Sequence, residues 1–343
     1  MRLLMALAVP ALLALPQEPS KITLEKTATV QELTAELSAA FHEKITLDPD
    51  MDDKRVTLQV RDAGLLEALD AVCRAHGGIS VLQPDSDGRE MRELVVKAEP
   101  WVEYPAAYSG AYRFTLVSFT RVRMKSELGD RSWTVVNMVL SSPPSFSIDR
   151  PPRGRDKTCT AAVDQDGHDV LPPPKEEDPL QLVEHQTSRS FLNTQAFSFI
   201  VREFDVDKGL RLFEGKVGVE EARLLEVPGA LEPGTRIDTP RGRILVQSLD
   251  RIERDGPTQS WVISLKFEPA GPGDKSARRA FETGCLIDKQ TEYVDLPWDE
   301  TREFQIRCSD LTARPKTMKL RVRLNPRTLE VPFSFKDAVF KAK

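Results

Sequence analysis

Residues 56–81, VTLQVRDAGLLEALDAVCRAHGGISV, decide how the first part of the chain folds. Residues 55–61 alternate polar and apolar side chains, which is the period of a strand with one buried face. We expect Asp62 to cap the helix that follows and Gly77-Gly78 to end it, because glycine accepts the left-handed backbone of helix C-termini. The apolar side chains at helical spacing in between are Leu65, Leu66, Leu69, Val72 and Cys73.

The residues on both sides extend this pattern into a complete α/β domain. A first helix is predicted over residues 30–41, because Thr29 and Glu32 form a capping box that satisfies two backbone N–H groups. Four short strand patterns accompany the helices, and the last two are expected to form a hairpin around residues 85–88. Residues 20–98 thus predict the order β-α-β-β-α-β plus a closing strand, with both helices on one face of a small sheet. The four short strand patterns are residues 22–24, 45–47, 79–82 and 93–97.

This order and the phrase in residues 56–81 resemble the short N-terminal domain of secretins and TonB-dependent receptors. In that family a strand is followed by a helix of the form A-L-D-x-V, here residues 68–72, and then by a glycine-ended turn and another strand. The resemblance implies a periplasmic or envelope interaction module without catalysis. A pore or receptor function is not implied, because neither a series of alternating transmembrane strands nor a glycine-rich secretin core follows.

The first residues predict export. Arg2 precedes the uncharged apolar run 3–15, which suits a signal peptide and is shorter than the roughly 20 residues of a membrane-spanning helix. We expect a signal peptide over residues 1–19, cut between Ala14 and Ser20, and a periplasmic or extracellular mature protein without a transmembrane segment. A buried N-terminal element or a retained anchor are the alternatives.

From residue 101 onward the chain has the pattern of an antiparallel β protein. Many short alternating runs are broken by Pro, Gly and Asp, as in β-sandwiches. We predict an α+β protein in which a sandwich-like domain spans residues 101–220, with a Pro-rich loop region at 141–190, and a second β-rich domain spans residues 233–343. One long sandwich is the alternative. The alternating runs are residues 112–117, 133–140, 197–201, 244–249, 261–267, 304–308, 318–324 and 329–335.

Two segments of this region resemble uncharacterised exported β-proteins of planctomycete-type bacteria, a resemblance that implies no activity. The first is SFLNTQAFSFIVREFDVDKGLRLFEGKVGVE, residues 190–220, in which two strands flank a turn. The second is NPRTLEVPFSFKDAVF, residues 325–340, which has the pattern of a last strand that closes a sandwich.

Charge argues against nucleic-acid binding. The chain carries 48 Lys and Arg against 53 Asp and Glu, a net charge of −5, whereas nucleic-acid binding needs a basic surface that replaces phosphate counterions. The basic residues within 121–125 alternate with apolar ones, which is typical of the solvated face of a strand.

Four cysteines are present, and export makes a disulfide permissible. Cys73 lies on the apolar face of a predicted helix and is expected to be a buried thiol. Cys285 and Cys308 flank one segment and are the candidate disulfide. Without a C-x-x-C motif or a Cys/His cluster, neither a zinc site nor a redox motif is predicted.

The sequence lacks the motifs of the common catalytic sites. It contains no G-x-S-x-G, no Gly-rich phosphate loop and no H-E-x-x-H. His42 and His76 end the predicted helices, where a cation complements the helix dipole, and His168 and His185 fall in loops. We therefore expect a non-catalytic protein with no catalytic, cofactor-binding or metal-ligating residue and no cofactor.

Two acidic segments contain spaced carboxylates of the kind that can bind calcium, but their patterns predict turns. DPDMDDK, residues 48–54, lacks the Gly at position six and the Glu at position twelve of an EF-hand loop. DQDGH, residues 164–168, is typical of a hairpin turn, in which Asp bonds its own backbone and Gly accepts positive φ.

Two hypotheses of function follow. The first is a cell-envelope protein that binds a protein partner by strand addition or through a sheet face. The alternative is a carbohydrate-binding or hydrolytic protein with its site on a sandwich, signalled by exposed aromatic side chains. We also expect Trp101 and Tyr104-Pro105 to plug the junction between the first domain and the sandwich. The candidate aromatic residues for the alternative are Trp101, Tyr104, Tyr108, Trp133 and Trp298.

Overall fold

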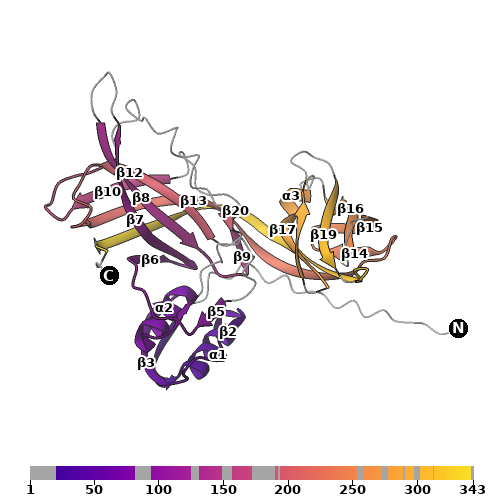
Figure 1. Cartoon of the computed structure of the whole chain (residues 1–343), viewed down its shortest axis with the longest axis horizontal. Helices are drawn as coiled ribbons and strands as arrows, with labels where there is room; N and C mark the ends of the chain where they lie inside the picture. The colour runs from indigo at the N-terminus through magenta and orange to yellow at the C-terminus, as the bar shows by residue number, and fades with distance from the viewer. Residues whose placement is uncertain are drawn as a thin grey trace.

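The protein consists of a small N-terminal α/β domain and two β lobes, as the computed structural model in Figure 1 shows. The expected α+β class with antiparallel, sandwich-like β structure is confirmed. The expected signal peptide and the turn at residues 85–88 lie outside the described residues. The structure describes residues 21–81, 94–124, 131–148, 157–171, 190–191, 194–252, 259–271, 277–288, 290–296, 302–311 and 313–340.

The N-terminal domain has the predicted order of elements but two sheets instead of one. β1 pairs antiparallel with β3, and a second sheet has the order β2-β5-β4. Each helix contacts one strand of each sheet: α1 contacts β1 and β2, and α2 contacts β3 and β4. The two helices and the two sheets therefore share one apolar core. The elements are β1 (Ile22–Thr29), α1 (Val30–Phe41), β2 (Ile45–Leu47), β3 (Arg55–Ala63), α2 (Leu65–His76), β4 (Ser80–Val81) and β5 (Leu94–Lys97).

Local signals set most of the helix ends. Thr29 and Glu32 form the predicted capping box of α1, and Gly77, with φ 80°, ends α2 and donates its N–H to Cys73. The prediction that Asp62 caps α2 is wrong, since Gly64 holds the N-cap position. Asp62 lies within β3 with φ 54°, and its carboxylate pairs with a lysine instead.

The first β lobe is built from a five-stranded sheet that shares an apolar core with parts of a larger sheet. The five-stranded sheet has the order β11-β12-β8-β7-β6. Its core includes a group of packed phenylalanines, among them Phe114, Phe199, Phe213 and Phe333. The strands are β6 (Ala106–Ser109), β7 (Tyr112–Met124), β8 (Arg131–Ser141), β11 (Ser190–Phe191) and β12 (Thr194–Arg202).

The larger, ten-stranded sheet runs through both lobes and has its own core in the second lobe. Its order is β10-β13-β20-β17-β18-β19-β16-β15-β14, with β9 paired to β13. Its elements are β9 (Phe146–Ile148), β10 (Lys157–Asp164), β13 (Leu210–Ala230), β14 (Arg236–Thr239), β15 (Gly242–Ile252), β16 (Gln259–Pro269), β17 (Phe281–Ile287), β18 (Gln290–Asp295), β19 (Glu303–Leu311) and β20 (Thr317–Ala338), together with the short helix α3 (Ala277–Ala280).

Two long paired strands connect the lobes, and this arrangement changes the predicted division of the chain. β13 and β20 pair over almost their whole length, with a register shift between Glu221 and Arg223 and a left-handed residue, Asn325, opposite it. The segment at residues 220–233, expected to separate two domains, is therefore largely strand. The end of β20, from Leu329 onward, packs in the first core, so residues 233–343 do not form a unit of their own.

Cys285 and Cys308 are not bridged in the structure. They lie on β17 and β19, which β18 separates, and both side chains are buried in the core of the second lobe. Strands about 4.8 Å apart place residues two strands away roughly 9–10 Å apart, whereas bridged cysteines have Cα atoms about 4.4–6.8 Å apart. A bridge would thus require β18 to leave its place. Cys73 is a buried thiol as expected, and burial raises its pKa to about 12.

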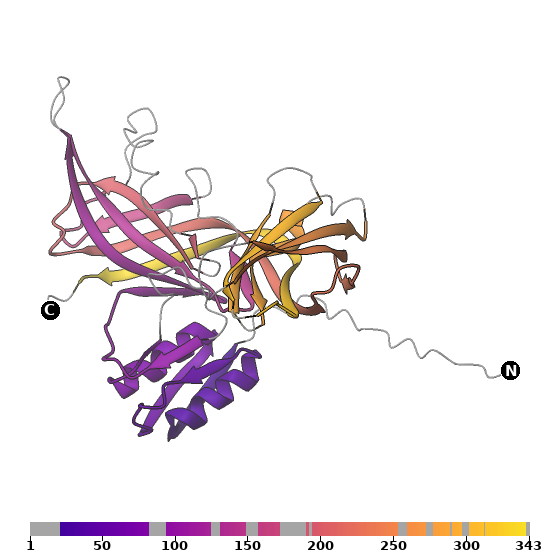
Figure 2. The ribbon, with the colours of Figure 1, turned by 45° about the vertical axis from the view of Figure 1, so that its right-hand side comes forward.

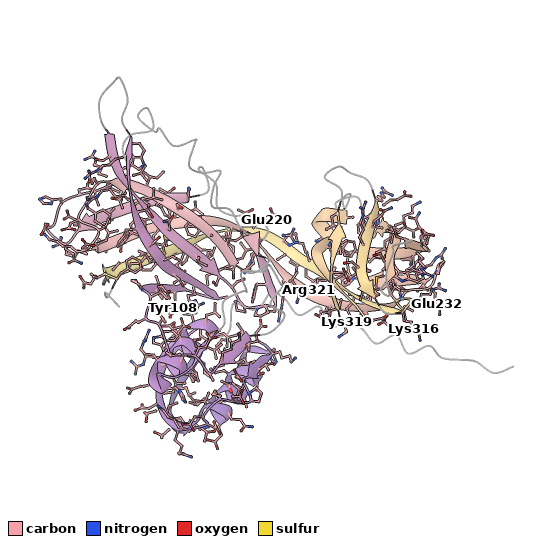
Figure 3. All side chains as sticks on the ribbon, viewed as in Figure 1. Tyr108, Glu220, Glu232, Lys316, Lys319 and Arg321 are labelled. Carbon is pink, nitrogen blue, oxygen red and sulfur yellow. The ribbon has the colours of Figure 1, made fainter. Side chains whose placement is uncertain are left out.

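None of the described helices is long and apolar enough to cross a membrane. Figure 2 shows the N-terminal domain below the first lobe, next to the ends of β6 and β7. Figure 3 places Tyr108 at this junction and Lys319 and Arg321 on the part of β20 that enters the second lobe.

Candidate functional site

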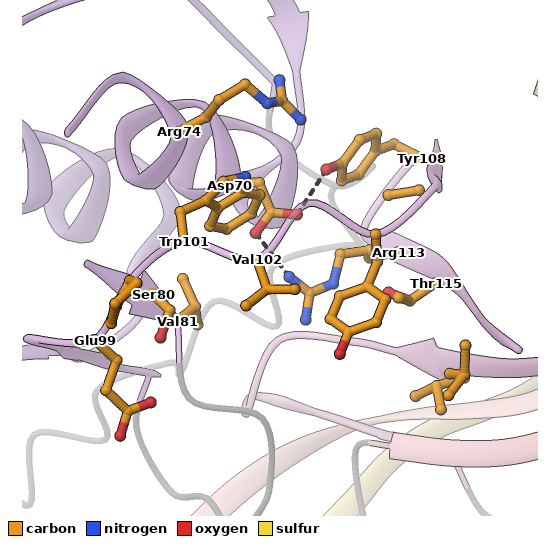
Figure 4. Close-up of a pocket in the computed structure, with 15 residues that line it drawn as sticks. Asp70, Arg74, Ser80, Val81, Glu99, Trp101, Val102, Tyr108, Arg113 and Thr115 are labelled. Atoms are coloured by element: carbon orange, nitrogen blue, oxygen red, sulfur yellow. Dashed lines mark hydrogen bonds and ion pairs between the residues drawn. The ribbon is translucent and has the colours of Figure 1, made fainter. Parts of the chain in front are cut away.

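A pocket of about 410 Å³ lies between the N-terminal domain and the first lobe. One wall consists of residues of α2 and β4, and the opposite wall consists of residues of β6, β7 and β8 (Figure 4). Residues 99–104, which connect the two domains, line it as well. Its volume falls within the range of about 300–1,000 Å³ that is usual for ligand sites.

Strand alternation places β7 side chains on both sides of its sheet. Phe114 and Leu116 point into the core of the first lobe, so Arg113 and Thr115 point to the opposite face. That face would meet solvent in an isolated sandwich, but here the N-terminal domain covers it. Arg113 is consequently only 6% exposed and Thr115 only 5%.

A buried ion pair joins the two domains beside the pocket. Arg113 Nη1 lies 2.7 Å from Asp70 Oδ1, and the Tyr108 hydroxyl donates to Asp70 Oδ2 at 2.6 Å. Because burial and the negative charge of Asp70 both raise the pKa of Tyr108, this hydroxyl keeps its proton. With both oxygens of Asp70 occupied, the group is arranged to hold the domains together and to orient Arg113.

Three polar atoms of the pocket residues have no hydrogen-bond partner among the described residues. They are Arg113 Nε, Thr115 Oγ1 and Trp101 Nε1. The end of the Arg113 guanidinium that is not bonded to Asp70 points into the space between Val102 and Thr115 (Figure 4). A buried polar group without a partner costs stability. These three atoms are themselves shielded from solvent, so the free end of the Arg113 guanidinium is the polar group that faces the pocket.

Exposed apolar side chains gather around the same pocket. Val102, Tyr104 and Val117, which are 40–42% exposed, all line it. The other comparably exposed large apolar side chains of the described chain lie elsewhere and include Leu225 and Ile252. A concave apolar surface with polar groups at its base is typical of binding sites.

Trp101 and Tyr104-Pro105 lie at the junction as predicted but do not close it, because Tyr104 is 41% exposed beside the pocket. Trp101 packs against the core of the N-terminal domain, and its backbone N–H donates to the carbonyl of Gly77 at 3.1 Å. The guanidinium of Arg74 lies 5.8 Å from the Trp101 ring centre, a cation–π distance. The carbonyl of Pro105 accepts from Leu116 and starts the pairing of β6 with β7.

Three of the five aromatic residues named as ligand candidates meet at this pocket: Trp101, Tyr104 and Tyr108. Trp133 lies apart from them in a small apolar cluster with Val135. Trp298 is outside the described part of the chain.

Two further contacts fix the N-terminal domain against the first lobe. Glu43, which is 7% exposed, accepts hydrogen bonds from the backbone N–H and the hydroxyl of Ser145. Burial raises the pKa of Glu43, and the Ser145 bonds and two arginines partly offset this. Gly64 approaches Gly110 so closely that a Cβ on Gly64 would overlap the carbonyl oxygen of Gly110.

The acidic segment at residues 48–54 is a turn that binds backbone groups. Asp48 accepts from the N–H of Asp50, and Asp53 accepts from the N–H of Gln31 at the start of α1. His76 accepts from the N–H of Gly78 through Nδ1, while its Nε2 lies 2.9 Å from the carbonyl of Asp52. The ring of His76 thus ties the turn to α2, and His76 lies at the end of this helix as predicted.

Asp164, Asp166 and His168 form the one group of potential metal ligands found in the described residues, with ligand atoms within 4.8 Å of each other. Asp164 accepts from the backbone N–H of His168, and Asp166 pairs with Lys208 at 2.8 Å. These bonds are those of a hairpin turn. His42 is the left-handed C-cap of α1, and His185 lies outside the described residues.

Comparison with protein-family models, with curated proteins and with solved structures found no match to this chain. Its site therefore has to be interpreted from its own residues.

Sequence reasoning did not predict Asp70 and Arg113 as site residues. Asp70 lies on the buried face of α2 next to Leu69, where an acid requires a partner. An acid at that position indicates a buried partner. The partner, Arg113, lies 43 residues later in the chain, and the sequence does not reveal this pairing.

Proposed function

We propose that this protein is an exported, non-catalytic cell-envelope protein that binds a protein partner at the junction pocket. Export is supported by the N-terminal pattern of Arg2 and the apolar run 3–15. The resemblance of residues 20–98 to the short N-terminal domain of secretins and TonB-dependent receptors supports an interaction module. The N-terminal domain supplies one wall of the pocket, so the binding surface includes it.

One observation carries the proposal: exposed apolar side chains gather at one cavity beside a buried arginine. Val102, Tyr104 and Val117 offer apolar contact area, and Arg113 and Thr115 line the same cavity. Interface hot spots are enriched in tyrosine and arginine, which Tyr104 and Arg113 supply here. The first lobe and the N-terminal domain, joined by the Asp70–Arg113 pair, hold Arg113 in place before a partner arrives, which lowers the entropic cost of binding.

The chemistry of the pocket suits binding better than proton transfer. Asp70 uses both oxygens for Arg113 and Tyr108, and the raised pKa of Tyr108 keeps its hydroxyl protonated. A general base must lie within hydrogen-bond reach of the proton that it removes, and both oxygens of Asp70 are instead directed at Arg113 and Tyr108. The network therefore acts as a fixed support for the pocket.

Site-specific photo-cross-linking in the producing cell tests the proposal. A photoreactive amino acid replaces Val117 in one strain and Ile252 in another, because these side chains are equally exposed and only Val117 lines the pocket. We expect a discrete protein adduct from position 117, weakened by Tyr104→Ala in the same chain, and none from position 252. Equal adducts at both positions, or no adduct at position 117, would contradict the proposal.

Carbohydrate binding is the second candidate, and the grouping of Trp101, Tyr104 and Tyr108 in the pocket favours it. Aromatic rings present apolar faces with a polar edge, which suits ligands that are apolar on one side. A glycan array probed with the full chain separates the two candidates. Binding of a defined glycan that is lost in Tyr104→Ala and kept in Ile252→Glu would favour the carbohydrate function.

A further inference from the structure

We infer that the junction pocket receives an extended, uncharged peptide segment of the protein partner, with an apolar side chain at the rim and a main-chain carbonyl on Arg113. This inference rests on the proposed function, because it names the chemistry of the bound segment. It is drawn from the hydrogen-bonding capacity of the pocket, its charge and the strand edge next to it.

The pocket carries both hydrogen-bond donors and acceptors. Arginine and the tryptophan indole can only donate, and these residues supply two of the three atoms without a partner. The carboxylates of Asp70 and Glu99, which also line the pocket, can only accept. An extended peptide brings one carbonyl acceptor and one N–H donor per residue, so its main chain can bond to both kinds of group.

The charges of the lining residues balance. Asp70 and Glu99 carry negative charge, and Arg74 and Arg113 carry positive charge. Arg113 is neutralised by Asp70 within the buried pair. An anionic group would gain little here and would lose its hydration on entering the pocket, so an uncharged segment fits best. The apolar rim adds the requirement for an apolar side chain.

A strand edge begins at the wall of the pocket. β6 pairs with Tyr112–Thr115 of β7 only. From Val117 to Met124, β7 has a strand neighbour on the β8 side alone, within the described part of the chain. Extended peptides add to such edges through main-chain hydrogen bonds and place alternate side chains in pockets.

This edge is protected against unspecific pairing. Arg121 and Arg123 on this part of β7 are exposed. Glu203 Oε1 lies 3.0 Å from Arg121 Nε and 3.7 Å from Arg123 Nη2. Charged side chains on an edge discourage aggregation while leaving the main chain available to a matched segment. The edge and the pocket meet at Val117, where the pairing of β7 with β8 shifts between Leu116 and Ser118.

Selection from a phage-displayed library of random peptides on the full chain tests this inference. We expect the selected peptides to share one apolar residue at a fixed position and to carry few charges. A synthetic peptide of the consensus is then titrated calorimetrically. Val117→Glu should weaken its binding by about tenfold or more, Thr115→Val by a few fold, and the matched control Ile252→Glu should leave it unchanged.

N-methylation of alternate main-chain nitrogens of the peptide provides a second readout, since it blocks strand pairing without changing side chains. We expect one set of alternate positions to abolish binding and the other to leave it nearly unchanged. Binding that is insensitive to both sets, or to Val117→Glu, would overturn the inference.

If no peptide is selected and a glycan binds in a manner that depends on Tyr104, the inference fails while the pocket remains a binding site. If neither probe depends on the pocket, the proposed function fails as well.

Discussion

The N-terminal domain and the second lobe are attached to the first lobe in different ways. The second lobe is continuous with the first through β13 and β20, whose main chains pair across both lobes. The N-terminal domain instead meets the first lobe through side chains: the Asp70–Arg113 pair, the Glu43–Ser145 bonds and the close approach of Gly64 to Gly110. An attachment through paired main chains leaves little room for a ligand, whereas two surfaces joined by side chains can enclose a pocket between them.

The largest effect is expected from removing the buried acid at the side-chain junction. Asp70→Ala should lower the free energy of unfolding by about 3–5 kcal/mol, because it leaves the Arg113 guanidinium buried without its partner. Urea denaturation followed by circular dichroism measures this change.

Lys216→Ala is the matched control for Asp70→Ala. Lys216 pairs with Glu330 at the same 2.7 Å distance, but both side chains are exposed. Its loss should cost less than about 1 kcal/mol. If the two substitutions lower the free energy of unfolding by the same amount, burial of the Asp70–Arg113 pair makes no extra contribution to stability.

A methyl group at the closest backbone contact should separate the N-terminal domain from the first lobe. Gly64→Ala is expected to cost about 1–3 kcal/mol, because the new Cβ would overlap the carbonyl of Gly110. Gly271→Ala is the control, since nothing lies within 4 Å of a Cβ there. Thermal unfolding of both variants checks the prediction, and unchanged stability in Gly64→Ala would mean that the contact does not form in solution.

The main-chain attachment has a left-handed residue in β20 opposite the register shift of β13, and Asp337 is a second left-handed residue near the end of β20. Asn325 has φ 48°, a conformation that asparagine tolerates and β-branched residues do not. We expect Asn325→Val to cost about 1–2 kcal/mol and Asn325→Gly to leave stability nearly unchanged. If calorimetry gives the same melting temperature for both variants, Asn325 is not held in this conformation.

The smallest effect should come from the pH dependence of Glu43. Burial raises its pKa above the usual 4.5, so the folded protein holds this proton more tightly than the unfolded chain. The corresponding stabilisation is present below pH 4.5 and is lost as the pH rises through the raised pKa. Glu43→Gln does not ionise, so its stability relative to the parent should increase with pH in this window. A relative stability that is constant or falls with pH would contradict this assignment.

The sequence predicts what is decided locally and misses what depends on docking. The Thr29–Glu32 capping box and the Gly77 terminus depend on neighbouring residues and are confirmed. The second sheet of the N-terminal domain depends on parallel pairing of β2 with β5, which lie far apart in the chain. The assignment of β20 to two cores likewise needs long-range pairing with β13.

The same division applies to the site. The sequence predicts Trp101 and Tyr104 at the junction, and both line the pocket. The pairing of Asp70 with Arg113 could not be predicted, because alternation alone places Arg113 on a face that a sandwich normally exposes to solvent. Only the docking of α2 onto that face buries it.

Hydrogen exchange of the full chain with and without the selected peptide tests most directly whether the junction is the binding site. We predict that the bound peptide slows exchange in residues 104–109 and in the β7 edge from Val117 to Met124, and leaves β15 and β16 of the second lobe unchanged. Slowed exchange confined to the second lobe, or none at the junction at a saturating peptide concentration, would contradict the assignment.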